Sequence, residues 1–219
     1  MRSGLVILAL FVSCVSPAQT IAASKKLIEF GWDEPTTAFM RKHVAQMEQM
    51  PFDGCVFMLL YDQPNGRQAS FLDECWGTRK FRESEFKSAE TDLAATHFKK
   101  FTSNFLRFDV TPGNVDWFDD FSAITSNARL AAKIAKRGKA AGILFDIEQY
   151  QSHLFDYSKQ RDVKTKSFDE YAAQARRRGR EVKAAFQAGY PDLHMLMTYG
   201  YLLPYAQVGA NQSKLAEAS

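Results

Sequence analysis

The segment Gly-Ile-Leu-Phe-Asp-Ile-Glu, residues 142–148, is an apolar run that ends in two carboxylates spaced two residues apart. Such a run is typical of a buried strand, in which residues i and i+2 share a face. We therefore expect Asp146 and Glu148 to point the same way, with Cα atoms about 6.6 Å apart. A buried strand that becomes acidic only at its C-terminal end is how a (β/α) barrel presents catalytic groups. The segment predicts an active site at that end.

Hydrophobic periodicity predicts strands that alternate with helices along the rest of the chain. The expected strands are 26–31, 54–60, 104–109, 141–148 and 194–199. The expected helices are 36–50, with Thr36 or Thr37 as its cap, then 84–98, 116–136 and 168–188, with Gly189 as the last cap. The polar segment 61–80 is expected to be a long loop. This alternation indicates parallel βαβ units.

The predicted fold class is α/β, of the (β/α) TIM-barrel type. Five strand candidates are too few for a full (β/α)8 barrel, which takes about 250 residues. An open doubly wound sheet could hold five strands, but no Gly-rich phosphate fingerprint follows any of them. We expect the N-terminal five β/α units of a larger barrel, incomplete at the C-terminus.

The N-terminus has the pattern of a secretory signal peptide. Arg2 precedes an apolar run, residues 5–15, and small and polar residues follow. The run is too short for a membrane span of about 20 residues. We expect a signal peptide over residues 1–23, a barrel domain over 24–219, a secreted or periplasmic protein, and no stable membrane anchor.

Composition excludes several classes of function. The net charge of +3 falls to about +2 without Arg2, which gives no electrostatic case for nucleic acid. The four histidines have no ligand spacing, so neither a metal nor another cofactor is expected. The basic run 176–180 is expected to be a solvated helix face. Cys55 and Cys75 could pair, although a buried thiol is favoured for Cys55.

Glu148 is the best candidate for a general acid, since aromatic neighbours at a strand end could raise its pKa. The alternative is a structural ion pair with Arg107 on the neighbouring strand. Asp146, one pleat deeper, could orient or tune Glu148, or could serve only as a buried hydrogen-bond acceptor.

Further candidates follow predicted strands, where a barrel builds its site. The candidate substrate-binding residues are Trp32, Asp33, Asp109, Tyr150 and Tyr199. Trp32 and Tyr199 could instead pack in the core, and Asp109 could cap a turn. Aromatic residues near other strand exits, Tyr61, Trp76 and Trp117, could also stack against sugars.

The segment 142–148 resembles the fourth-strand signature of the family 18 glycoside hydrolases, Asp-Gly-x-Asp-x-Asp-x-Glu. Gly142, Asp146 and Glu148 match it, whereas Ala141 and Leu144 stand where the signature has acids. Residues 197–199, Met-Thr-Tyr, are similar to that family's Met-x-Tyr-Asp strand, with glycine in place of the final Asp.

The resemblance implies a carbohydrate substrate. It also implies that Glu148 protonates the glycosidic oxygen while Asp146 assists the substrate's own N-acetyl group as the nucleophile. The expected function is a secreted glycoside hydrolase acting on a polysaccharide or glycan. The alternative is a noncatalytic carbohydrate-binding barrel or an inactive barrel fragment.

Overall fold

The computed structural model describes residues 25–31, 33–110, 113–148 and 153–200. Its main sheet has five strands in the order β1-β2-β5-β6-β7, all paired in parallel. Their bounds are β1 Ile28–Glu29, β2 Gly54–Phe57, β5 Phe105–Asp109, β6 Gly142–Asp146 and β7 His194–Met197. Strand order thus follows chain order, as in a (β/α) barrel.

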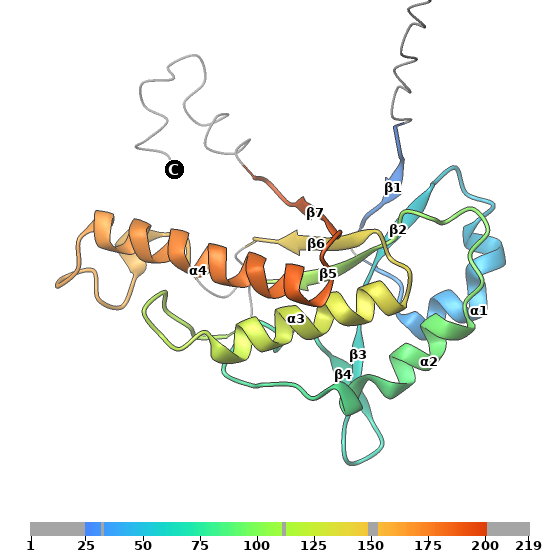
Figure 1. Cartoon of the computed structure of the whole chain (residues 1–219), viewed down its shortest axis with the longest axis horizontal. Coiled ribbons are helices and arrows are strands. Elements are labelled where there is room, and N and C mark those ends of the chain that lie inside the picture. The colour runs from blue at the N-terminus through green and yellow to red at the C-terminus, as the bar shows by residue number, and fades with distance from the viewer. Residues whose placement is uncertain (1–24, 32, 111–112, 149–152, 201–219) are drawn as a thin grey trace, which may run out of the picture.

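The sheet curls into a half-barrel whose helices flank one face (Figure 1). The helices are α1 Thr37–Met47, α2 Lys87–Ala95, α3 Ser122–Arg137 and α4 Phe168–Gly189. A doubly wound sheet would reverse its strand order and carry helices on both faces. The described chain is therefore an α/β protein with a partial barrel, as the strand pattern predicted.

The two faces of the sheet bury different sets of side chains, because alternate strand residues point to opposite faces. Leu106, Phe108 and Ile143 belong to the large core that also contains the helix residues. Val56, Phe105 and Leu144 form a separate small cluster. Apolar residues on both faces explain why these strands appear as nearly continuous hydrophobic runs.

Gly142 is needed for strand pairing. A Cβ at this position would lie 1.8 Å from the carbonyl oxygen of His194 on β7. The backbone of β7 can approach only because the residue has no side chain. The glycine of the 142–148 segment therefore has a packing role that does not depend on any family resemblance.

Side-chain caps set two of the helix starts. The Thr36 hydroxyl accepts a hydrogen bond from the Phe39 N–H, which confirms a threonine cap on α1. Ser167 and Glu170 form a capping box at the start of α4. Gly189 is the last residue of α4 rather than its cap, which is Tyr190.

The prediction of a long loop over 61–80 was wrong. Strands β3 (Leu60–Asp62) and β4 (Gln68–Ser70) form an antiparallel hairpin in this region. Gly66, with φ 78°, lies in the turn after Asn65, and this Asn-Gly pair is a strong hairpin signal.

Other elements are shorter than the sequence predicted. A 3₁₀ turn, Glu83–Phe86, precedes α2, and α3 begins at Ser122 rather than at residue 116. Strand β6 ends at Asp146, two residues before Glu148.

Cys55 and Cys75 are free and buried, so no disulfide joins them. Burial raises the pKa of Cys55 to about 12 and also raises that of Cys75. Within the described residues, no helix is long and apolar enough to cross a membrane. The expected signal peptide, residues 1–23, lies outside the described residues.

Candidate functional site

The carboxyl ends of β5 and β6 bring two acidic side chains together. Asp109 and Asp146 are register partners at the ends of these strands. Arg107 lies one pleat deeper, opposite Leu144, with only 16% of its side chain exposed. An arginine inside a buried sheet needs anionic partners, since an unpaired buried charge is very unfavourable.

Arg107 bridges three carboxylates, and we call these four residues the strand-end cluster. Its Nη1 donates a hydrogen bond to Glu34 Oε1 over 2.6 Å, and its Nη2 donates one to Asp109 Oδ2 over 3.2 Å. Nη2 also lies 2.6 Å from Asp146 Oδ2, at an angle unsuited to a hydrogen bond. Three carboxylates and one guanidinium give the cluster a formal charge of −2.

The carboxylates of the strand-end cluster are well shielded from water. Side-chain exposure is 5% for Glu34, 10% for Asp109 and 1% for Asp146. Burial acts to lower the pKa of Arg107, but the neighbouring carboxylates, Asp146 first, raise it above its usual value. Arg107 therefore stays charged and ties the loop after β1 to β5 and β6.

The chain that leaves β7 holds the second oxygen of Asp146. The Thr198 hydroxyl donates to Asp146 Oδ1 over 2.8 Å and accepts from the Ile147 N–H over 3.0 Å. The Glu148 N–H also donates to Asp146 Oδ1, over 3.0 Å. Asp146 thus fixes the backbone that carries Glu148.

Glu148 itself lies beyond the strand in a turn, so the expectation that strand geometry aligns it with Asp146 does not hold. Its side chain is half-buried, and Oε1 accepts a hydrogen bond of 2.5 Å from the Tyr199 hydroxyl. This hydrogen bond, followed by the charge of Glu148, raises the pKa of Tyr199. Arg107, the alternative partner, is engaged by the strand-end cluster instead.

Tyr199 adopts the left-handed conformation, with φ 60°, and its side chain remains exposed. A non-glycine residue in this region is strained, and such strain often marks functional sites. The structure places Tyr199 beside Glu148, so two of the predicted site residues are in direct contact.

The other predicted residues differ in their placement. Asp109 is buried in the strand-end cluster, whereas Asp33 is exposed after β1. Trp32 and Tyr150 lie outside the described residues.

Three of the aromatic residues considered for sugar stacking are buried. Tyr61, Trp76 and Trp117 are 1%, 3% and 6% exposed. The Trp76 ring packs against Phe121, and Trp117 Nε1 donates to the Leu154 carbonyl. They build the core beneath the strand exits, so stacking on sugar is excluded for them in this structure.

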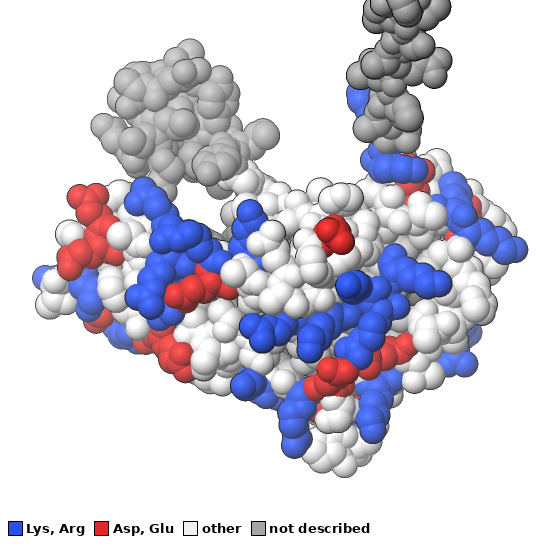
Figure 2. Space-filling model, viewed as in Figure 1, with Lys and Arg blue, Asp and Glu red and all other residues white. Residues whose placement is uncertain are grey.

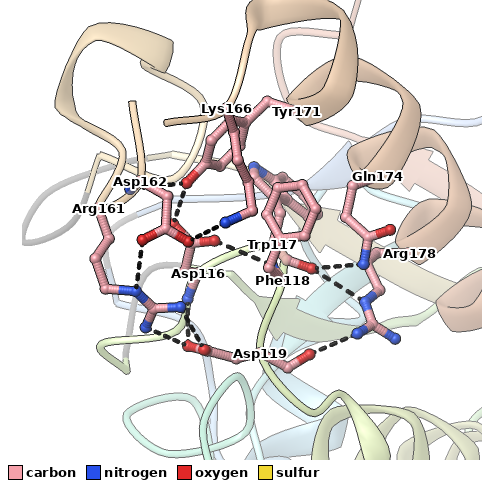
Figure 3. Close-up of polar contacts among 10 residues, drawn as sticks. All are labelled: Asp116, Trp117, Phe118, Asp119, Arg161, Asp162, Lys166, Tyr171, Gln174 and Arg178. Atoms are coloured by element: carbon pink, nitrogen blue, oxygen red, sulfur yellow. Dashed lines mark hydrogen bonds and ion pairs between the residues drawn. The ribbon is translucent and has the colours of Figure 1, made fainter. Parts of the chain in front are cut away.

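The loops after β5 and β6 are joined by a second set of polar contacts, shown in Figure 3. We call Asp116, Asp119, Arg161, Asp162, Lys166 and Tyr171 the loop network. Arg161 Nη2 donates to Asp119 Oδ1 over 2.7 Å, and the Tyr171 hydroxyl donates to Asp116 Oδ2 over 3.0 Å. Nearby, Arg178 of α4 donates to the carbonyl oxygens of Trp117 and Asp119. The network holds the loops after β5 and β6 against α4.

The sequence interpretation missed Glu34 and Thr198 and treated Arg107 only as a partner for Glu148. A usable signal was present, because Arg107 interrupts the apolar strand Phe-Leu-Arg-Phe. Glu34 could not be identified as its partner, since 73 residues separate the two.

No His, Cys, Asp or Glu residues in the described part of the chain are grouped to hold a metal ion. Comparison with known proteins found no matching family model, no similar curated protein and no similar solved structure. The functional argument therefore rests on the fold and on the geometry at the strand ends.

Proposed function

We propose that this protein is a secreted glycoside hydrolase built on a partial (β/α) barrel of the TIM type. Glu148 would be the proton donor to the glycosidic oxygen. Asp146, whose carboxylate is buried, would position Glu148 through the turn it holds. The substrate would be a polysaccharide or glycan.

The observation that carries the proposal is the contrast between two carboxylates that are two residues apart. Asp146 is fully buried and held by Arg107 and Thr198, while Glu148 follows the strand end, is only half-buried and accepts a hydrogen bond from the exposed Tyr199. Carboxylates in different environments can divide acid and charge-stabilising roles. Their position at the carboxyl end of a parallel strand supports a catalytic site in a barrel.

The test is Glu148→Gln, which keeps the side-chain shape and removes the transferable proton. The parent protein is first assayed on soluble N-acetylglucosamine oligomers and then on other polysaccharides. We expect the variant to lose about 10²- to 10⁴-fold in kcat while its affinity for the oligosaccharide changes little. Asp73→Asn is the matched control, because Asp73 is exposed and far from the site in sequence. Retained turnover in Glu148→Gln would refute the proposal.

A second candidate function is noncatalytic carbohydrate binding. The exposed ring of Tyr199, at 53% exposure, favours it, because ring stacking serves binding as well as catalysis. This alternative predicts sugar binding by the parent without turnover, and unchanged affinity in Glu148→Gln.

A further inference from the structure

The C-terminal half of helix α3 exposes basic side chains, whereas its first turns expose only neutral ones. Its sequence contains Arg129, Lys133, Lys136 and Arg137 and no acidic residue. Among the residues that the structure describes, Arg137 alone of these four is in an ion pair, with Glu83 and Glu90 of the preceding elements, and Lys136 Nζ lies 5.8 Å from the centroid of the Tyr190 ring. The remaining three have a spacing of four and three residues, which places them on one face of the helix.

Helix α4 repeats this arrangement. Arg176, Arg180 and Lys183 have the same spacing, are exposed, and form no ion pair with any described residue. Glu181, the one acidic residue of this stretch, is engaged by Arg177 and Arg178. Both helices therefore carry exposed cations that form no ion pair with a described carboxylate.

The two rows lie on neighbouring helices, and Figure 2 shows blue areas over α4 and over α3 on the same face of the molecule, with white and red atoms between them. A Cβ on Gly189 would lie 2.3 Å from the Arg129 carbonyl oxygen, and Arg178 reaches Asp119 just before α3. In both contacts, the α4 residue and its neighbour at α3 differ by nearly the same residue number, so the two helices run parallel. With this shift, the row on α4 ends close to where the row on α3 begins. We call Arg129, Lys133, Lys136, Arg176, Arg180 and Lys183 the cationic band. At 1.5 Å per residue the band is about 27 Å long.

We propose that the cationic band binds an anionic polysaccharide, one that carries carboxylate or sulfate groups along an extended chain. A linear polyanion can contact all six cations at once, which a small anion cannot do. The proposal concerns the outer helix face and does not depend on Glu148.

Two other polyanions fit the band less well. Single-stranded nucleic acid is usually held by aromatic stacking, and duplex DNA usually takes one helix into its groove. The stretches 129–136 and 176–183 contain no aromatic residue, the one described ring in contact with the band being that of Tyr190 beside Lys136, and they follow one another along two neighbouring helices. An anionic membrane surface would favour exposed apolar side chains beside the cations, and neither stretch exposes a large one.

The test measures binding of the full chain to heparin, a sulfated polysaccharide, at about 50 mM salt, where screening is weak. The test variant replaces four cations of the band: Arg129→Gln, Lys133→Gln, Arg180→Gln and Lys183→Gln. The control variant removes the same charge from exposed cations elsewhere: Lys42→Gln, Arg67→Gln, Lys80→Gln and Lys87→Gln. Circular dichroism establishes that both variants are folded.

We expect the test variant to bind heparin at least about tenfold more weakly, and the control variant to bind within about twofold of the parent. Parent affinity should fall as salt rises, and Glu148→Gln should bind as the parent does. Absent binding by the parent, or equal losses in both variants, would overturn the proposal. Equal or tighter binding of duplex DNA or of anionic lipid vesicles would also overturn it.

Discussion

The strand-end cluster and the loop network contain ion pairs of nearly equal length in very different surroundings. Arg107 approaches Glu34 and Asp146 to 2.6 Å, and Arg161 approaches Asp119 to 2.7 Å. The Arg107 side chain is 16% exposed and that of Arg161 is 56% exposed. The distance between the charged atoms therefore does not indicate how much an ion pair contributes to stability. Burial decides how much the loss of one partner costs, since water can replace the partner only at the exposed pair.

The largest expected effect comes from Arg107→Met. It removes the one cation from the strand-end cluster and leaves three buried carboxylates that repel one another. We expect the free energy of unfolding at pH 7 to fall by about 3–5 kcal/mol. Chemical denaturation measures this, with Arg161→Met as the matched variant. Equal losses in the two variants would show that burial does not distinguish the clusters.

Thr198→Val should have an intermediate effect. The variant keeps the shape of the side chain but removes the hydroxyl that joins Asp146 to the Ile147 N–H. We expect a loss of about 1–2 kcal/mol in the free energy of unfolding. If Asp146 positions the turn of Glu148, any hydrolytic activity should also fall, and Thr198→Ser should restore both. A variant that matches the parent in stability would show that this link is dispensable.

The smallest effect is expected for Arg161→Met, well below that of Thr198→Val at pH 7, because solvent screens this exposed ion pair. The hydrogen bond from Arg161 lowers the pKa of Asp119 below 3.8. A carboxyl with a lowered pKa stabilises the fold above its ordinary pKa, and this stability is lost as the pH falls through the lowered value. The deficit of the variant should therefore begin to shrink as the pH falls below the ordinary value of 3.8, disappear once the pH is below the lowered pKa of Asp119, and shrink in concentrated salt. Stability curves against pH check this, and a deficit that persists in acid would contradict the assignment to Asp119.

Apolar periodicity was enough to predict the five parallel strands, because burial on both faces of a sheet requires nearly continuous apolar runs. Their order needed a further argument, since an open doubly wound sheet also holds five strands. It was not enough for the hairpin at Asn65-Gly66, whose strands are only three residues each. It also could not show that Trp76 and Trp117 are core residues, since a tryptophan near a strand exit can pack or stack equally well.

The candidate site was predicted in part. Local sequence indicated Asp146 and Glu148 as functional candidates and placed Tyr199 at a strand end. The partnership of Arg107 with Glu34 depends on two distant segments meeting in the fold, and no local pattern encodes it. The turn at Glu148 depends on hydrogen bonds to Asp146 that a strand pattern does not anticipate.

The edge position of strand β7 affects the stability of the candidate site. In the described part of the chain it pairs only with β6, and Leu196 and Met197 remain 40% and 51% exposed. An edge strand with so little burial opens at low free energy, so its amides should exchange with solvent sooner than those of β6. Thr198 and Tyr199 follow directly, and each opening of β7 would release their contacts to Asp146 and Glu148 together. Local unfolding of β7 would thus free Glu148 and one oxygen of Asp146 together, while Arg107 still holds Glu34 and Asp109.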